Sequence, residues 1–333
     1  MQQFLLIQTA FIGDVVLATA LVEKLKHHFP GAGIDFLLRK GNESLLANNP
    51  AVREVITWDK KKDKIKNLFL ILQKIRATRY DKVINLQRYF STGLLTAFSG
   101  ATETIGFDKN PLAFLFSKKV AHVFDLKHPR HEVEKNNDLV AHFTDNRFFK
   151  PALYPSLQDA EDVKKYTAGN YVTITASSVW FTKNYPIEKW IDLINKLPPS
   201  LGIYLLGGKE NVAECEIILA KTTNKKVEIL AGKLGFLGSA ALMKKAVMNY
   251  TNDSAPLHFA SGVNAPVTAI FCSTIPGFGY TPLSEVSFII QTKEALPCRP
   301  CGIHGHKACP LTHFKCGHGI HTQQLLKTLI IPA

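Results

Sequence analysis

The sequence predicts an α/β protein built from two domains, each with a parallel β-sheet covered by helices. Short apolar runs alternate with segments whose apolar residues recur at helical spacing, and this pattern holds in both halves of the chain. The length of 333 residues suggests two domains. The composition, 46% hydrophobic and 20% charged, allows large cores and excludes a disordered chain.

The first half of the chain opens with a strand, a helix and a second strand. We predict strands at residues 4–8 and 34–38, a turn at residues 9–14 and a helix that starts at Val15 and ends at Phe29. In open parallel sheets, ligands bind at the carboxyl ends of the strands, which is where this turn lies. The turn lacks the Gly-x-Gly-x-x-Gly pattern, so a dinucleotide site of that type is disfavoured.

Asp14 stands at the end of this turn and has two interpretations. It is either the N-cap of the following helix, or a carboxylate that faces a cleft and takes a proton from a substrate hydroxyl. Gly13 beside it would let a substrate approach the backbone closely. The sequence alone leaves both interpretations open.

The rest of the first half continues the alternation. Residues 59–66 form a charge run that is typical of a solvated loop and helix face, with a patch for acidic lipid as the alternative. We predict a helix at residues 68–75, a strand at 80–87 and a helix from His131 to about residue 143. The segment 150–155 carries two prolines and no periodicity, which indicates a domain boundary.

The second half repeats the pattern, and its first loop carries hydroxyl groups and a lysine. Strands are predicted at residues 171–175, 202–206, 227–231, 248–252 and 265–271. The loop after the first of these contains Ser177, Thr182 and Lys183 ahead of a helix, an arrangement that suits a phosphate. The alternative is an ordinary strand-to-helix loop. Glu210 lies just beyond two glycines and either meets a ribose or begins a solvent-facing helix.

A polar break before a helix follows the strand at residues 248–252. Asp253 or Ser254 can cap this helix, and Pro256 suits its first turn. A helix start presents unpaired N–H groups and partial positive charge, which attract a phosphate. The alternative is a capped helix with no ligand.

These elements give a specific domain arrangement. We expect two Rossmann-like domains that face each other across a cleft. The predicted segments are an N-terminal domain at 1–155, a C-terminal domain at 156–320 with a cysteine-rich loop at 297–318, and a C-terminal helix at 321–333.

The charge favours anionic partners. The formal net charge is +13 and the sequence pI is about 9.4. A nucleic-acid binder is the rival class, but the lysines are scattered and form no basic stripe, so we expect no nucleic acid. No apolar run is long enough to span a bilayer, and the N-terminus resembles a strand rather than a signal peptide. We therefore expect a cytoplasmic protein.

Five of the six cysteines lie after residue 270. Cys298, Cys301, Cys309 and Cys316, with histidines between them, suit a structural zinc ion. The alternative is a set of free or paired thiols, and a reducing compartment argues against a disulfide framework.

Four motifs, in order along nearly the whole chain, carry a resemblance to a known family. They are Ile12-Gly13-Asp14-Val15-Val16 with the Phe29-Pro30-Gly31-Ala32 helix end, Tyr80-Asp81-Lys82-Val83-Ile84-Asn85-Leu86-Gln87, Thr182-Lys183-Asn184-Tyr185-Pro186-Ile187-Glu188-Lys189-Trp190 and Asn252-Asp253-Ser254-Ala255-Pro256-Leu257-His258-Phe259-Ala260. Together they resemble glycosyltransferase family 9, the lipopolysaccharide heptosyltransferases.

The resemblance implies a GT-B fold and inverting transfer of a heptose from an ADP-sugar donor to the lipopolysaccharide inner core, with no cofactor required for catalysis. The implied acceptor is an anionic glycolipid of the lipid A/Kdo type, reached by transient contact with the inner face of the cytoplasmic membrane. The resemblance assigns Asp14 as general base, Lys183 and its neighbouring hydroxyls as diphosphate ligands, and a lining of the donor site by Asp253, Ser254, Ala255 and His258. Ala255 stands where the family usually has glycine. After the next strand, Phe271-Cys272-Ser273-Thr274 stands where the family usually has Phe-Gly-Pro-Thr. The alternatives are a nucleotide-sugar epimerase of the same architecture and an inactive family member.

Overall fold

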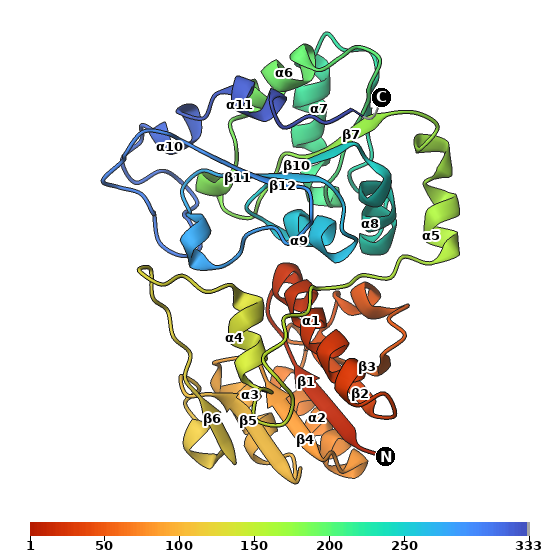
Figure 1. Cartoon of the computed structure of the whole chain (residues 1–333), viewed down its shortest axis with the longest axis vertical. Coiled ribbons are helices and arrows are strands. Elements are labelled where there is room, and N and C mark those ends of the chain that lie inside the picture. The colour runs from red at the N-terminus through yellow and green to blue at the C-terminus, as the bar shows by residue number, and fades with distance from the viewer. Residues whose placement is uncertain (332–333) are drawn as a thin grey trace. The chain divides into compact units, whose positions relative to one another are not determined.

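The chain divides into two compact units, which we describe separately. The computed structural model describes residues 1–331. Unit 1 covers Met1–Tyr154 and unit 2 begins at Pro155, next to the boundary predicted after residue 155 (Figure 1). No helix within the described residues is both long and apolar enough to cross a membrane.

Unit 1 is a six-stranded parallel sheet with helices on both faces. Its strands are β1 (Gln3–Ile7), β2 (Gly33–Arg39), β3 (Val52–Trp58), β4 (Lys82–Asn85), β5 (Glu103–Phe107) and β6 (Lys118–Val120). The strand order is β3-β2-β1-β4-β5-β6, and every adjacent pair is parallel. The order reverses between β1 and β4, so the loops after these two strands leave toward opposite faces. Such a switch point is where open α/β sheets bind ligands.

The helices of unit 1 cover a sheet that is buried on both faces. They are α1 (Ile12–His28), α2 (Lys64–Thr78), α3 (Phe90–Ala97) and α4 (Glu132–Asp138). Helix α1 contacts α4, and α2 contacts α3. Four of the five residues of β1 are fully buried, as expected for a central parallel strand, and Trp58 is the largest buried side chain of this unit.

Unit 2 repeats the same topology. Its strands are β7 (Tyr171–Thr175), β8 (Gly202–Leu205), β9 (Val227–Ile229), β10 (Met248–Asn252), β11 (Val267–Phe271) and β12 (Ser287–Gln291). The order is β12-β11-β10-β7-β8-β9, again parallel throughout. The switch point lies between β7 and β10. The expectation of two Rossmann-like domains is confirmed for each unit.

Helices pack on both faces of the second sheet as well. They are α5 (Leu157–Asp162), α6 (Ile187–Lys196), α7 (Val212–Lys221), α8 (Phe236–Lys245), α9 (Ala255–Gly262), α10 (Lys315–His318) and α11 (Thr322–Leu326). Helix α6 contacts α7 and α11 on one face, and α8 contacts α5 and α9 on the other (Figure 1). Trp190 and Tyr185 meet edge to face in the core, with ring centroids 5.1 Å apart.

Several predicted boundaries were wrong. Helix α1 begins at Ile12, inside the predicted turn, and α4 ends at Asp138 rather than near residue 143. The predicted C-terminal helix is shorter: α11 ends at Leu326, and residues 332–333 of the predicted helix lie outside the described part of the chain. Edge strands β3 and β12 were missed because their partly exposed residues give no continuous apolar run.

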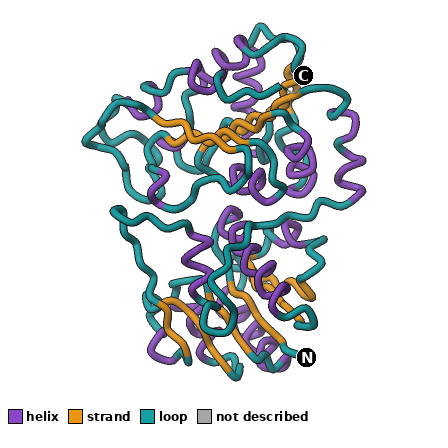
Figure 2. Tube along the Cα trace, viewed as in Figure 1, coloured by secondary structure: helices purple, strands orange, loops and turns teal. Residues whose placement is uncertain are grey.

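A long irregular segment joins β12 to α10. Residues 292–314 contain no helix or strand, and the tube in Figure 2 is a loop along this stretch. Cys298, Cys301 and Cys309 belong to it.

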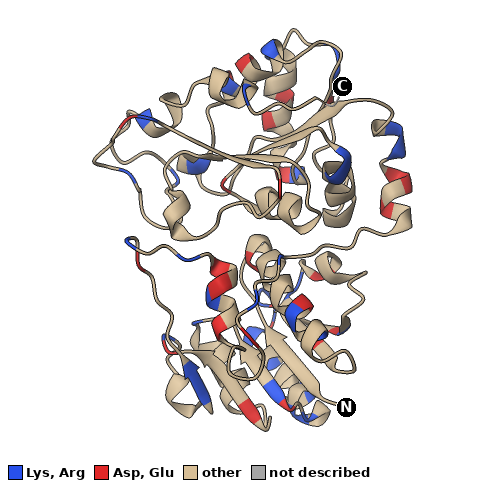
Figure 3. Ribbon diagram, viewed as in Figure 1, with Lys and Arg blue, Asp and Glu red and all other residues tan. Residues whose placement is uncertain are grey.

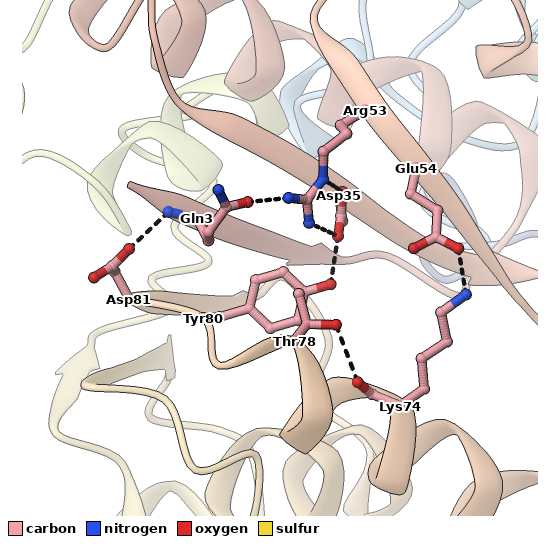
Figure 4. Close-up of polar contacts among 8 residues, drawn as sticks. All are labelled: Gln3, Asp35, Arg53, Glu54, Lys74, Thr78, Tyr80 and Asp81. Carbon is pink, nitrogen blue, oxygen red and sulfur yellow. Dashed lines mark hydrogen bonds and ion pairs between the residues drawn. The ribbon is translucent and has the colours of Figure 1, made fainter. Parts of the chain in front are cut away.

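A buried polar cluster joins the amino-terminal parts of the strands in unit 1 (Figure 4). Asp35 of β2 is fully buried. Its carboxylate accepts hydrogen bonds from Arg53 Nε at 2.9 Å and from the Tyr80 hydroxyl at 2.5 Å. The cluster lies at the sheet edge opposite to the carboxyl ends of the strands, so its role is structural.

Candidate active site

The switch point of unit 2 brings two predicted site residues together. Lys183 lies in the loop after β7 and Asp253 directly follows β10. Lys183 Nζ lies 2.7 Å from Asp253 Oδ2, and both side chains are largely buried. The Thr274 hydroxyl, from the segment after β11, donates a 2.6 Å hydrogen bond to the same carboxylate oxygen. Asp253 therefore orients the lysine at the carboxyl ends of the strands, the edge at which open α/β sheets bind ligands.

Thr182 connects this loop to the irregular C-terminal segment. Its hydroxyl accepts from the His306 backbone N–H at 2.8 Å and from Ser273 Oγ at 3.0 Å. Thr182 is itself buried. Gly305 has a φ of +77°, and a Cβ at this position would lie 2.8 Å from Thr182 Oγ1, so only glycine fits here. Thr182 thus fixes the neighbouring backbone, and its contact with the donor stays a prediction.

Asn252 fastens the loop after β7 to the end of β10. The side chain is fully buried. Its amide nitrogen donates to the Ala176 carbonyl, and its oxygen accepts from the Tyr185 backbone N–H at 2.9 Å. Both ends of the lysine-bearing loop are therefore held by one side chain.

The other predicted donor residues are spread around this switch point. Ser177 donates to the Glu214 carboxylate, so its hydroxyl is engaged within the protein. Glu210 lies exposed after β8, as the solvent-facing interpretation expects. His258 is buried on α9, with its ring centroid 6.4 Å from that of Tyr280.

The start of α9 differs from the predicted capping. Ser254 is the N-cap residue by position, but its side chain makes no capping hydrogen bond and donates instead to the Asn252 carbonyl at 3.4 Å. Asp253 is engaged with Lys183 and Thr274. Ala255 is the first helical residue and Pro256 the second. No side chain of these residues therefore caps the first turn, and the Leu257 N–H donates to the Ser254 carbonyl at 3.1 Å.

Asp14 lies in the first turn of α1. Phe11 is the N-cap residue, and its backbone N–H donates to Asp14 Oδ2 at 3.2 Å. The N-cap interpretation of Asp14 was therefore wrong by three positions, because the helix starts earlier than predicted. Gly13 is likewise helical. The carboxylate is partly exposed, at the switch point of unit 1.

A pocket of about 490 Å³ opens beside this turn. It is lined by residues from the loops after β1 and β4, together with Arg39, Lys60 and Lys64. Lys60 and Lys64 belong to the charge run at 59–66, which was predicted to be solvated. The structure places Lys60 and Lys64 of that run at a pocket, which Arg39 also lines although no local sequence signal marks it.

Arg299 anchors the cysteine-rich segment to the sheet of unit 2. Its guanidinium donates to the carbonyls of Cys272 at 2.7 Å and Thr274 at 2.7 Å, and to Gln291 Oε1 at 2.8 Å. Cys301 N–H donates to the Ser273 carbonyl at 2.9 Å. The segment therefore packs on residues that adjoin the Lys183–Asp253 pair.

Cys298, Cys301 and Cys309 of this segment and Cys316 of α10 all have free thiols. Burial raises the pKa of Cys316 to about 11, and the nearby thiols of Cys301, Cys309 and Cys298 add to the shift. No group of three or more His, Cys, Asp or Glu side chains within residues 1–331 is arranged to hold a metal ion. The thiol positions as they stand do not form a zinc site, and the zinc hypothesis stays a prediction.

Most of this chain matches the model of one protein family. The model for glycosyltransferase family 9 (heptosyltransferase) matches residues 69–308. The chain belongs to glycosyltransferase family 9. It is therefore an enzyme of the glycosyltransferase class, and the resemblance drawn from the four motifs is confirmed. The matched range includes Lys183 and Asp253 but not Asp14.

Named relatives support the membership in glycosyltransferase family 9. The chain is 27% identical over 309 residues to lipopolysaccharide heptosyltransferase 3 of Escherichia coli K12, covering 86% of this chain and 88% of the relative. It is 24% identical over 312 residues to lipopolysaccharide heptosyltransferase 1 of Pseudomonas aeruginosa, covering 89% and 85%.

Solved structures of glycosyltransferase family 9 share the fold. The family 9 glycosyltransferase of Veillonella parvula has a TM-score of 0.85 at 19% identity, covering 98% of this chain and 96% of that one. The ADP-heptose LPS heptosyltransferase II of E. coli has a TM-score of 0.81 at 20% identity, covering 99% and 97%. The E. coli heptosyltransferase WaaC, solved with ADP, has a TM-score of 0.71 at 18% identity, covering 87% and 93%. The predicted GT-B fold is confirmed.

Proposed function

We propose that this glycosyltransferase moves a heptose from ADP-heptose to the inner core of lipopolysaccharide. The named relatives are lipopolysaccharide heptosyltransferases, and E. coli WaaC was solved with ADP and with an ADP-2-deoxy-2-fluoro heptose. The acceptor in this proposal is an anionic glycolipid of the lipid A/Kdo type.

The observation that supports the proposal is that Asp14 in unit 1 and Lys183 in unit 2 each lie at the switch point of a parallel sheet. Asp14 of unit 1 takes the proton from the attacking acceptor hydroxyl. The hydroxyl oxygen then bonds to the anomeric carbon as the bond from that carbon to the ADP oxygen breaks, with inversion. Lys183 and the start of α9 in unit 2 stabilise the negative charge that develops on the departing diphosphate. The proton ends on Asp14 and ADP is the leaving group, so the proposed step needs no cofactor.

Lys183 must change its partner, at least in part, for this role. In the structure its charge is engaged by Asp253 at 2.7 Å. A diphosphate carries more negative charge than one carboxylate, and it competes for the same ammonium. We therefore assign Asp253 the role of holding Lys183 in place before the donor binds.

We further propose that unit 1 touches an anionic membrane surface through the start of α2, at the inner face of the cytoplasmic membrane. Ile65 and Phe69 are 71% and 55% exposed, and they stand four positions apart on one face of the helix. Lys62 and Lys66 are exposed beside them. Apolar residues flanked by lysines suit the interface of an anionic bilayer. Elsewhere in the described residues, Lys and Arg are spread over both units (Figure 3).

A donor screen tests the proposed reaction. The wild-type chain is incubated with ADP-heptose, ADP-glucose or UDP-glucose, with and without a Kdo-lipid acceptor, and both released nucleotide and glycolipid product are measured. We expect ADP release from ADP-heptose that depends on the acceptor and yields one heptose on the lipid per ADP. Conversion of the nucleotide sugar without acceptor would instead support the epimerase, and no turnover with any donor would support an inactive member.

A further inference from the structure

Four buried amide side chains lie at the carboxyl ends of the unit 1 strands, and the proposed reaction uses none of them. They are Gln8 after β1, Asn85 at the end of β4, Gln87 just beyond it and Asn110 after β5. Their exposed fractions lie between 0% and 7%. Gln87 also closes one of the four motifs that resemble glycosyltransferase family 9. Burying an uncharged amide costs free energy unless it is hydrogen-bonded, so the partners of these groups indicate their role.

Gln87 and Gln8 connect the segments that follow two adjacent strands, β4 and β1. Gln87 Nε2 donates to Gln8 Oε1, across the switch point of the sheet. The same Gln8 oxygen accepts from the Ala10 backbone N–H at 3.2 Å. A single oxygen atom therefore links Gln87 to the turn that leads into α1.

This turn carries the proposed general base. Ala10 is followed by Phe11, whose backbone N–H donates to Asp14 Oδ2 at 3.2 Å. The start of the turn is fixed as well, because Lys60 Nζ donates to the Thr9 carbonyl at 3.1 Å and to Thr9 Oγ1 at 2.9 Å. The position of the carboxylate thus depends on hydrogen bonds from side chains that follow β1, β3 and β4.

The backbone of Gln87 is itself held on both sides. Its N–H donates to Asn85 Oδ1 at 2.8 Å, and its carbonyl accepts from Asn110 Nδ2 at 3.1 Å. Asn110 packs against Gly93 of α3, where a Cβ would lie 2.2 Å from Asn110 Oδ1, so any larger residue would displace the amide. The Gln87 side chain therefore starts from a fixed point and reaches Gln8 in one orientation.

Gln87 makes this bond at a cost in stability. Its Oε1 atom is buried and has no hydrogen-bond partner among the described residues. A buried acceptor without a partner lowers the free energy of unfolding. Side chains that break this rule are expected near functional sites, where orientation matters more than stability.

We propose that Gln87 is a positioning residue for the transfer reaction. It orients Gln8, and Gln8 fixes the turn that holds Asp14. Gln87 touches no reacting atom in this role. A general base must lie within hydrogen-bond reach of the hydroxyl that it deprotonates, and a displacement of about 1 Å lowers the rate roughly 100-fold. The effect on rate rests on the proposed transfer reaction, whereas the order of the turn does not.

Hydrogen exchange tests the bridge between Gln87 and Gln8 without turnover. The exchange rate of the backbone amides at residues 8–14 is measured by mass spectrometry in the full chain. Gln87→Leu keeps a side chain of similar size but removes the amide, so it should speed exchange in this segment about tenfold or more. Exchange as slow as in the wild type would overturn the bridge.

Asn49→Leu is the matched control for both measurements. Asn49 is also buried, and its Oδ1 accepts from the Ala51 N–H at 2.9 Å. It precedes β3 and so lies at the opposite edge of the sheet. This variant should leave both the exchange at residues 8–14 and kcat unchanged. Effects as large as those of Gln87→Leu would overturn the assignment, because they would show that any lost amide in unit 1 suffices.

Kinetics with ADP-heptose and a Kdo-lipid acceptor test the effect on rate. Gln87→Leu and Gln8→Leu should each lower kcat about tenfold or more and leave the affinity for ADP within about twofold. The double variant should be no slower than the slower single variant, because both substitutions break the same bond. Losses that multiply in the double variant would show that Gln87 does not act through Gln8.

Gln87→Glu adds a measurement that general destabilisation would not change. Its carboxyl group can donate to Gln8 Oε1 only while protonated, and burial raises the pKa of a carboxyl above its usual value of about 4.3. Its kcat, divided by that of the wild type at the same pH, should therefore fall as pH rises from 5 to 9. For Gln87→Leu this ratio should stay constant. A ratio of one for Gln87→Glu at pH 9, where the carboxyl is ionised, would overturn the role of the bond.

Two outcomes separate this inference from the proposed function. If Gln87→Leu speeds exchange at residues 8–14 but the wild type transfers no heptose, the proposed function fails and Gln87 remains the residue that orders the turn. If the wild type transfers heptose and Gln87→Leu keeps its kcat, the positioning role fails alone.

Discussion

Lys183 Nζ lies 2.7 Å from Asp253 Oδ2 at the switch point of unit 2, and the Thr274 hydroxyl donates to the same oxygen. The pair joins the loops that follow two adjacent strands, β7 and β10. Both partners are largely buried, so the interaction is shielded from solvent and constrains the lysine more than a surface pair would. The lysine proposed to bind the donor phosphate is thus held in place at the sheet edge.

Replacing Lys183 by Met should weaken ADP binding about tenfold or more, because one charge-assisted contact to the diphosphate is lost. Isothermal titration of the wild type and the variant with ADP measures this directly. Lys196→Met is the control, since Lys196 forms an exposed pair with Asp192 on α6. If both variants bind ADP with wild-type affinity, Lys183 is not a donor ligand.

Replacing Asn252 by Ala should lower the free energy of unfolding by about 2–4 kcal/mol. The Ala176 carbonyl and the Tyr185 N–H would each lose a buried hydrogen-bond partner. Urea unfolding measures the change. Asn170→Ala, at an exposed position, should stay within about 0.5 kcal/mol of the wild type. Equal stabilities of both variants would show that the Asn252 bonds do not hold the loop.

Substitutions in the buried cluster around Asp35, at the amino-terminal ends of the unit 1 strands, should lower the free energy of unfolding without affecting catalysis. Arg53→Met should cost about 3–5 kcal/mol, because it leaves the fully buried Asp35 carboxylate without its ionic partner. Lys74→Met is the matched control: its pair with Glu54 is nearly half exposed and should contribute less than about 1 kcal/mol (Figure 4). A comparable cost for both variants in urea unfolding would contradict this interpretation.

The same cluster predicts a dependence on alkaline pH. Burial and the bond to Asp35 raise the pKa of Tyr80 in the folded state. The contribution of the Tyr80 hydroxyl to the free energy of unfolding is therefore complete below the pKa of the unfolded chain, about 10. It is lost as pH rises from there through the higher pKa of the folded state. Unfolding free energies of the wild type and Tyr80→Phe should converge above pH 10. A constant difference across that range would contradict the prediction.

The central strands were predictable from the sequence, because strands buried on both faces leave continuous apolar runs. Strands β1 and β11 come closest to this pattern, whereas β7 and β10 are equally buried but include threonine or asparagine. The β3 strand was not predicted, since its partly exposed residues break the apolar run. That omission hid the pocket, because Lys60 follows β3 and a recognised strand would have placed it at the carboxyl edge of the sheet.

Local sequence marks only those candidate site residues that stand directly after a strand and before a helix. Lys183 and Asp253 stand at strand-to-helix junctions, which local sequence reveals. The Thr274–Asp253 bond spans 21 positions and the Lys60–Thr9 bond spans 51. Such pairs follow from the strand order, which the local pattern does not contain.

Thiol labelling tests the zinc hypothesis. In the chain without metal, Cys298, Cys301 and Cys309 should react with iodoacetamide well before Cys215 and Cys272, which are buried and have a raised pKa. Bound zinc would protect the first three until a chelator removes it, and elemental analysis would then find about one zinc per chain. Labelling of these three thiols that stays equally rapid after zinc is added, with no zinc retained by the chain, would exclude the structural zinc.

The most direct test of the account is the effect of Asp14→Asn on heptose transfer. The substitution keeps the size of the side chain and an oxygen that accepts from the Phe11 N–H, but removes the base. We predict that kcat with ADP-heptose and a Kdo-lipid acceptor falls about 100-fold or more, while the affinity for ADP stays within about twofold. A kcat equal to that of the wild type would contradict the assignment of Asp14 and the mechanism built on it.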